Sequence, residues 1–249
     1  MENLTATASA RDQDASSGSR RGSQAGTTLQ PGSPEGSGGT SPARLKLAAA
    51  LRDLGHSLVA HQPPDELLER ITAAIGELLP EIERAPERPH AFLQSPPTFF
   101  QGEVPQGPPK EPGDVFPDCV VSGRANPMGI AARLWREGDE AVCQVTLGPA
   151  FEGAPGRAHG GVVAALLDEA MGLALSISGS PGFTGRLAVT YRAPTPLGVP
   201  LEARSRLTAR DGRKLTISAE LRADGELLAQ AEGLFISVDT DQFLAAGRG

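Results

Sequence analysis

Aromatic residues, cysteine and histidine are all scarce in this sequence. Its 249 residues include one Trp, one Tyr, eight Phe, two Cys and four His. So few aromatic side chains do not favour a pocket lined by aromatic rings. Cys119 and Cys143 lie in no spacing typical of metal ligands, and the histidines are too scattered for a zinc site. The composition therefore predicts no metal centre and two free thiols.

Two kinds of segment are also missing. No apolar run reaches the roughly 18 residues that a membrane-spanning helix needs. The residues Met1–Leu4 do not lead into the apolar core of a secretory signal. Together with the low cysteine content, this predicts a cytoplasmic protein. The formal net charge of −7 argues against a nucleic-acid partner, because phosphate binding needs clustered Lys and Arg.

Common catalytic and nucleotide-binding motifs are absent as well. No G-x-S-x-G elbow of a serine hydrolase lies in the part of the chain predicted to fold. No G-x-G-x-x-G follows a predicted strand, and no Walker loop is present. Serine hydrolases of the α/β type and the usual nucleotide-binding folds are therefore disfavoured.

Composition divides the chain into four parts. Residues 1–42 are rich in Ser, Gly, Thr, Ala and Pro without periodicity, which predicts a disordered tail. Residues 43–85 carry apolar residues at helical spacing on both sides of His61-Gln62-Pro63, which predicts a helical hairpin. Residues 86–118 are rich in proline and form either a linker or an ordered strap over the next domain. Residues 119–240 are predicted to form the main domain.

In the main domain the pattern predicts two strands, one long helix and four further strands. The turn residues Glu137-Gly138-Asp139, Asp211-Gly212 and Asp224-Gly225 indicate hairpins. The predicted strands are residues 129–136, 140–147, 185–193, 201–209, 214–223 and 226–238. This order predicts an α+β fold. The helix is expected on the concave face of an antiparallel sheet, because no other apolar surface is large enough to cover it.

The predicted helix begins at His159-Gly160-Gly161 and is apolar apart from Asp168 and Glu169. Bare backbone N–H groups at a glycine-rich helix start can polarise a substrate oxygen. An ionised carboxylate on a buried helix is costly unless something compensates it. A helix start that stabilises an oxyanion and a sheltered carboxylate two turns later are typical of an acyl-transfer site. The alternative is that both acids are surface charges or salt-bridge partners.

The run from His159 to Asp168 resembles the HGG-x(6)-D signature of hotdog-fold acyl-CoA thioesterases, of the type related to phenylacetate-pathway and human thioesterase-superfamily proteins. The resemblance covers residues 119–238 and includes Tyr191–Pro196 and Asp211–Lys214. It implies a hotdog fold that hydrolyses a fatty acyl-CoA. The resemblance does not set the length of the acyl chain, for which we expect a medium or long chain. It implies no cofactor, since coenzyme A is part of the substrate. The alternative is a non-catalytic acyl-CoA-binding or regulatory module.

By this resemblance, Asp168 is the catalytic carboxylate and acts either as general base or as nucleophile. The N–H of Gly161 or of Gly160 contacts the thioester oxygen, and His159 positions the substrate. Thr184 matches a hydroxyl residue that faces the catalytic carboxylate across a dimer interface.

The same resemblance predicts where coenzyme A binds. Thr190 and Arg192 match positions that contact it, and Arg213 with Lys214 matches cations that hold its phosphates. A basic pair at a hairpin turn is also common on an ordinary protein surface. Relatives often carry a polar amide six residues before the histidine, and that position is Gly153 here.

A single domain of this kind leaves sheet edges exposed, so we expect a homodimer, and dimers in this family commonly pair into tetramers. No histidine follows Asp168, which argues against hydratase chemistry. Glu169 is expected to have a structural or supporting role. The hairpin at 43–85 is expected either to pack on the sheet or to cap the acyl tunnel. Deletion of residues 1–85 would distinguish these two, because loss of a cap would change the acyl preference.

Overall fold

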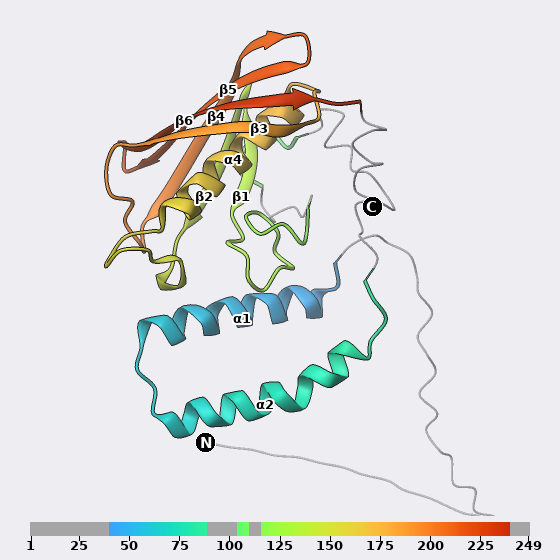
Figure 1. Cartoon of the computed structure of the whole chain (residues 1–249), viewed down its shortest axis with the longest axis vertical. Helices are drawn as coiled ribbons and strands as arrows, with labels where there is room; N and C mark the ends of the chain where they lie inside the picture. The colour runs from blue at the N-terminus through green and yellow to red at the C-terminus, as the bar shows by residue number, and fades with distance from the viewer. Residues whose placement is uncertain (1–39, 89–103, 110–115, 240–249) are drawn as a thin grey trace, which may run out of the picture. The chain divides into compact units, whose positions relative to one another are not determined.

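The structure is a computed structural model that describes residues 40–88, 104–109 and 116–239 (Figure 1). Residues 1–39 of the predicted tail and much of the predicted linker at 86–118 therefore lie outside the described residues, whereas residues 40–42 of the tail are described and lead into the first helix.

Two helices of nineteen residues come first, α1 (Pro42–Ala60) and α2 (Asp65–Glu83). The side chain of Ser41 caps the start of α1. Asp65 and Glu66 lie in the first turn of α2, where carboxylates interact favourably with the helix dipole. The helices fall where the sequence predicted them. Because α2 buries none of its residues, packing of the two helices into a hairpin stays a prediction.

Six antiparallel strands form one sheet in the order β1-β2-β4-β5-β6-β3. Their bounds are β1 (Arg133–Glu137), β2 (Glu140–Thr146), β3 (Gly182–Tyr191), β4 (Pro200–Asp211), β5 (Lys214–Ala223) and β6 (Glu226–Ser237). This confirms the predicted arrangement of strands around one helix. The first strand begins later than predicted because Ala131, with φ of 57°, is in a left-handed conformation that interrupts a strand.

The predicted hairpin turns are confirmed. Asp224 and Gly225 both have positive φ, 47° and 84°, as a two-residue type I′ turn requires. Gly212, with φ of 55°, lies in the turn between β4 and β5.

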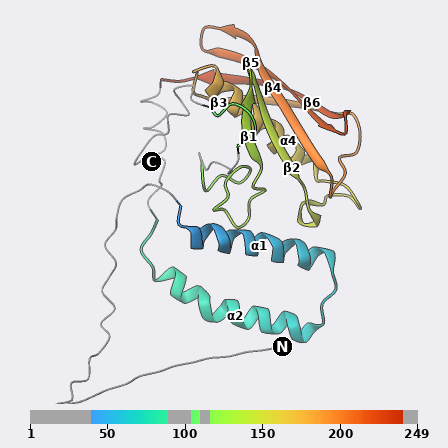
Figure 2. The ribbon, with the colours of Figure 1, turned by 180° about the vertical axis from the view of Figure 1, so that it is seen from behind.

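The helix α4 (Gly160–Ile177) lies along one face of the sheet, which curves around it (Figures 1 and 2). α4 has the length and hydropathy of a membrane span, but half of it is buried inside the domain, as expected for a core helix. Each fully buried leucine contributes about 1.5–3 kcal/mol to the core. The fully buried side chains include Leu166, Leu167, Met171 and Leu173 of α4, with Leu201, Leu215, Ile217, Leu221 and Phe235 of the sheet.

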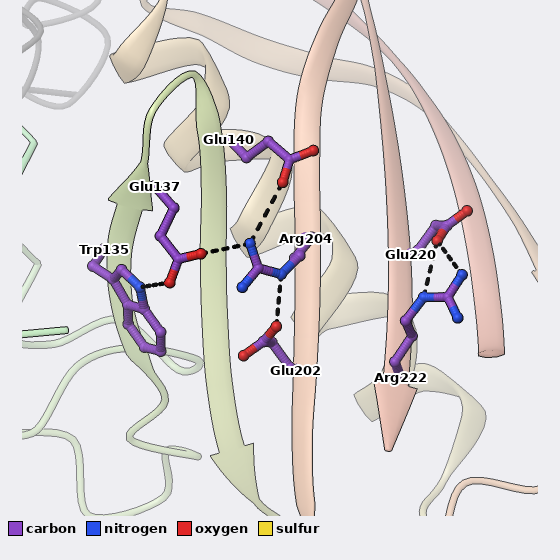
Figure 3. A network of polar contacts seen from close by, with 7 residues as sticks. All are labelled: Trp135, Glu137, Glu140, Glu202, Arg204, Glu220 and Arg222. Carbon is purple, nitrogen blue, oxygen red and sulfur yellow. Dashed lines mark hydrogen bonds and ion pairs between the residues drawn. The ribbon is translucent and has the colours of Figure 1, made fainter. Parts of the chain in front are cut away.

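The opposite face of the sheet is polar (Figure 3). Arg204 forms ion pairs with Glu137 at 2.7 Å, with Glu140 at 3.5 Å and with Glu202 at 2.6 Å. Solvent reaches all of these side chains, so each pair contributes at most about 1 kcal/mol to stability. Charged and buried residues alternate along each strand, so only one face of the sheet is apolar. α4 covers that apolar face.

Residues 104–109 and α1 also contact the domain, as does Arg88, which pairs with Asp118. Residues 104–109 run beside β1, where Gln106 forms a parallel bridge with Arg136. These six residues lie along β1, and the choice between a linker and a strap for the whole region stays a prediction. From α1, Arg52 donates to the backbone oxygens of Arg124 and Asn126, at 3.0 and 2.8 Å.

α1 also contacts the short 3₁₀ turn η2 (Pro149–Phe151) that precedes α4. The ring of His56 packs edge-on against Phe151, with centroids 5.3 Å apart, and the Ala150 N–H donates to His56 Nδ1 at 3.1 Å. Neither of the two predicted roles of the hairpin included this contact.

Candidate active site

The chain enters α4 through His159, which is the N-cap residue. The Gly161 N–H donates to the ring nitrogen Nδ1 of His159 at 3.0 Å. A side-chain acceptor at the cap satisfies one of the backbone donors that a helix start leaves unpaired. The imidazole therefore stabilises the first turn of α4.

The hydrogen bond between Gly161 and His159 bears on the expectation that the N–H of Gly161 or of Gly160 contacts the thioester oxygen. The Gly161 N–H is occupied by the imidazole, so it is not available to a thioester oxygen in this structure. No hydrogen bond to the Gly160 N–H is present among residues 40–88, 104–109 and 116–239. Of the two predicted donors, Gly160 is therefore the better placed.

Gly153 lies directly against His159. A Cβ atom at position 153 would lie 2.7 Å from the His159 Cα, so this backbone has no room for the polar amide expected from the resemblance. The loop between Phe151 and His159, which contains Gly153, is closed by the His159 N–H, which donates to the Phe151 oxygen at 2.9 Å. On the other side, the Tyr191 hydroxyl donates to the Gly160 oxygen at 2.8 Å and connects β3 to the helix start.

A cavity of about 590 Å³ lies beside the helix start. His159, Gly160 and Tyr191 line it, and Arg157 and Arg192 give it positive charge. The Arg192 Nε also donates to the Gln230 side chain at 3.1 Å. Thr190 is not among the lining residues, so the structure brings Arg192 to this cavity without Thr190.

Asp168 is half-buried in the third turn of α4. Its Oδ1 accepts a hydrogen bond from the Thr184 hydroxyl at 3.0 Å. Thr184 belongs to β3 of the same chain. Within this chain the two groups already meet, and the expected contact across a dimer interface stays a prediction.

A β-bulge directs Thr184 towards the helix. Thr184 pairs with Phe235 and Arg186 pairs with Leu234, so Gly185 is the extra residue between them. Strict alternation along the strand would place Thr184 on the same face as Arg186, away from α4. The signal that sequence reasoning missed is the glycine itself, because a glycine inside a strand often marks a bulge.

A second cavity, of about 150 Å³, lies against Asp168. Asp168, Glu169, Thr184 and Ser176 supply its polar groups. The remaining lining residues are Phe116, Leu134, Gly172, Leu173, Leu175, Pro181, Gly182 and Phe235. The arrangement is a carboxylate at the edge of a mostly apolar cavity, which suits a substrate with a polar reacting group and an apolar tail.

Glu169 points to different partners from those of Asp168. The Ser122 hydroxyl donates to Glu169 Oε1, and the Cys119 thiol lies 3.5 Å from both carboxyl oxygens. Burial raises the pKa of Glu169, and the negative charge of Asp168 adds to this, while the bonds from Ser122 and Cys119 oppose it. The sequence did not predict these partners, because they lie about fifty residues away along the chain.

Arg213 and Lys214 lie at the turn between β4 and β5. The Arg213 Nε donates to the Ser237 oxygen at 3.0 Å. The strand register places this turn at the end of the sheet where Thr184 lies, whereas Arg192 lies at the opposite end. The predicted coenzyme A contacts therefore fall into two groups within one chain.

The helix start and Asp168 are also separated within one chain. Because each helical residue rises about 1.5 Å, Gly160 and Asp168 lie about 12 Å apart along the axis of α4. An oxyanion donor must lie about 3 Å from the substrate oxygen, and a general base must reach the attacking water. The Gly160 N–H and the Asp168 carboxylate of one chain therefore cannot act on the same thioester.

Comparison with known proteins identifies the domain. Residues 155–230 match the family described as the thioesterase superfamily. A thioesterase superfamily protein of known crystal structure is 28% identical and covers 79% of this chain and 92% of its own, with a TM-score of 0.65. The domain has the hotdog fold, and residues 155–230 within it match the thioesterase superfamily. The predicted fold and superfamily are thereby confirmed.

Curated relatives of this thioesterase-superfamily domain are named acyl-coenzyme A thioesterases. THEM4 of Bos taurus is 34% identical over 119 residues, which are 46% of this chain and 49% of that protein. THEM5 of Mus musculus is 30% identical over 105 residues, which are 41% of this chain and 42% of that protein. The chain spans about half the length of the curated relatives that it matches.

Proposed function

We propose that this protein hydrolyses the thioester of a fatty acyl-CoA to the free acid and coenzyme A, with Asp168 as the catalytic carboxylate. The observation that carries the proposal is the Asp168 carboxylate, held by Thr184 beside an apolar cavity in a thioesterase-superfamily domain. The names of the curated relatives support the same substrate class. Preference for medium or long chains, and a cytoplasmic location, stay predictions.

In the proposed reaction, Thr184 fixes Oδ1 of Asp168 and leaves Oδ2 for the substrate. As general base, Asp168 takes a proton from the water whose oxygen attacks the carbonyl carbon. As nucleophile, it attacks that carbon itself and gives a mixed anhydride, which water then hydrolyses. In both routes the C–S bond breaks and the coenzyme A thiolate leaves and takes up a proton. Neither route uses a cofactor.

The carbonyl oxygen gains negative charge as the water or Asp168 attacks. In the proposal the Gly160 N–H stabilises that charge, helped by the positive end of α4. His159 keeps the helix start in shape through its bond to the Gly161 N–H. These roles for His159 and the two glycines stay proposals.

We also propose a homodimer, because the two halves of the site lie about 12 Å apart along α4 within one chain. β3 is an edge strand of the sheet and exposes Phe183 and Tyr191. Antiparallel pairing of β3 with a second copy would place the Tyr191 end of one strand beside the Thr184 end of the other. The helix start of one subunit would then approach Asp168 of its partner. Pairing of dimers into tetramers stays a prediction.

The same pairing would unite the two groups of predicted coenzyme A contacts. Arg213 and Lys214 of one subunit would lie near Arg192 of the other, so that all three could reach the phosphates. Thr190 stays a predicted contact on the exposed face of β3.

Thiol release from a panel of acyl-CoAs, short to long and aryl, tests the proposal with wild type and Asp168→Asn side by side. We expect wild type to turn over at least one class and Asp168→Asn to lose about 100-fold or more in kcat, because it lacks the carboxylate base. Coenzyme A binding and the melting temperature should change little. A folded Asp168→Ala variant with near-normal activity would contradict the proposal. Binding of acyl-CoA by wild type without thiol release would support the non-catalytic module.

A further inference from the structure

The 116–132 segment, between the strap and β1, folds upon itself. The Ile130 N–H donates to the Val120 oxygen and the Ala132 N–H donates to the Val121 oxygen, both at 2.8 Å. The Gly123 N–H donates to the Cys119 oxygen at 3.0 Å. These bonds make the segment a compact loop rather than an extended connection.

The loop contributes Phe116 to the wall of the cavity beside Asp168. Phe116, at its start, and Leu134, just after its end, both line the cavity. The other walls come from α4 and from the ends of β3 and β6. A shift of the 116–132 segment away from α4 would therefore widen the cavity.

Glu169 of α4 connects this segment to the cavity, whereas Arg52 of α1 bonds to the Arg124 and Asn126 oxygens farther along the segment. Glu169 accepts the hydrogen bond of the Ser122 hydroxyl and lies 3.5 Å from the Cys119 thiol, and it also lines the cavity. Both donors belong to the segment. Removal of the carboxyl group would leave both without this acceptor and would open space beside the cavity.

We propose that Glu169 is a specificity-determining residue, which sets the width of the acyl cavity by holding the 116–132 segment against α4. The proposal rests on the proposed thioesterase function of this cavity. Glu169 acts through Ser122 and Cys119 and is a positioning residue, in contrast to Asp168, to which the reaction itself is assigned.

The test compares Glu169→Ala, Glu169→Gln and wild type on straight-chain acyl-CoAs from acetyl to palmitoyl. We expect Glu169→Ala to raise the ratio of kcat/KM for the longest substrates over the shortest by about tenfold, mainly through KM. Glu169→Gln keeps an oxygen acceptor for Ser122 and should retain the wild-type profile. The double variant Cys119→Ala, Ser122→Ala should reproduce the shift. Glu232→Gln, an exposed carboxylate of β6, is the matched control.

Hydrogen exchange of the 116–132 amides gives a readout that does not need activity. Exchange should become faster in Glu169→Ala and stay unchanged in Glu169→Gln. An equal loss on every substrate, or an unchanged profile and unchanged exchange in folded Glu169→Ala, would overturn the proposal. Absence of thiol release by wild type would instead overturn the proposed function, and the exchange result would still decide whether Glu169 holds the segment.

Discussion

At the residue scale, two adjacent carboxylates have different surroundings. Consecutive residues of a helix point about 100° apart, so Asp168 and Glu169 face different neighbours. Thr184 bonds to Asp168, whereas Ser122 and Cys119 approach Glu169. The resemblance already assigned the reaction to Asp168 and a supporting role to Glu169, and the packing around α4 shows that the two acids have different hydrogen-bond partners.

The raised pKa of Glu169 predicts a pH-dependent stability. The pKa of Glu169 is higher in the folded than in the unfolded protein, so protonated Glu169 favours the folded state. This contribution to the free energy of unfolding is fully present below the pKa of the unfolded protein, and it is lost as pH rises through the pKa of the folded protein. Glu169→Gln is neutral at every pH. We therefore expect its melting temperature to match wild type in acid and to exceed it at pH values above the folded pKa.

Thermal unfolding between about pH 4 and pH 8 checks this prediction. Among the residues that the structure describes, the titratable groups that interact with Glu169 are Asp168, Cys119 and Cys143. Glu232→Gln again serves as the control, since its carboxylate is exposed. A difference between Glu169→Gln and wild type that stays constant across the pH range would contradict the prediction.

At the element scale, α1 supports the turn that leads into the active site. His56 holds η2 through the Ala150 N–H and the Phe151 ring, and the Phe151 oxygen accepts the His159 N–H. This series of contacts connects an N-terminal helix to the N-cap of α4. Helical periodicity predicted α1, but it carried no information about this contact.

His56→Ala should therefore impair catalysis without removing any group that touches substrate. We expect kcat/KM to fall by about tenfold, because small displacements of catalytic groups are costly. His61→Ala is the matched control, since His61 Nδ1 contacts only the Ser57 oxygen of its own helix among the contacts described. Steady-state kinetics and hydrogen exchange of residues 149–159 measure the effect. Equal activities of the two variants would contradict the prediction.

At the scale of the whole molecule, the proposed site needs two chains. The separation of Gly160 from Asp168 along α4 and the exposed edge of β3 both favour a shared site. The larger cavity beside the helix start and the smaller one beside Asp168 would then belong to one substrate path.

Mixed dimers test the shared site. Asp168→Ala and Gly160→Val should each be inactive, the second because its side chain covers the helix start. Mixing the two after unfolding and refolding should restore about a quarter of wild-type activity, since half of the dimers are mixed and each has one intact site. Thiol release and sedimentation of the mixture measure this. An active monomer, or a mixture of dimers that stays inactive, would contradict the prediction.

Much of the fold could be predicted because its signals are local. Turn residues such as Asp224-Gly225 fix hairpins through their own backbone preferences, and the apolar run of α4 requires burial wherever it occurs. Gly160 and Asp168 were predicted as site residues from the glycine-rich helix start, from the carboxylate two turns later and from the resemblance to the HGG-x(6)-D signature, and these roles stay predictions.

Only the tertiary structure decided how the candidate site is assembled. The bulge at Gly185 turns Thr184 towards Asp168, and the fold of the 116–132 segment brings Ser122 to Glu169. The His159 ring occupies the Gly161 N–H. The first two contacts depend on strand register and on segments that are distant along the chain, and the third depends on the local geometry of the helix cap. Side-chain periodicity predicts which face a residue occupies, but it does not predict register, cap geometry or distant partners.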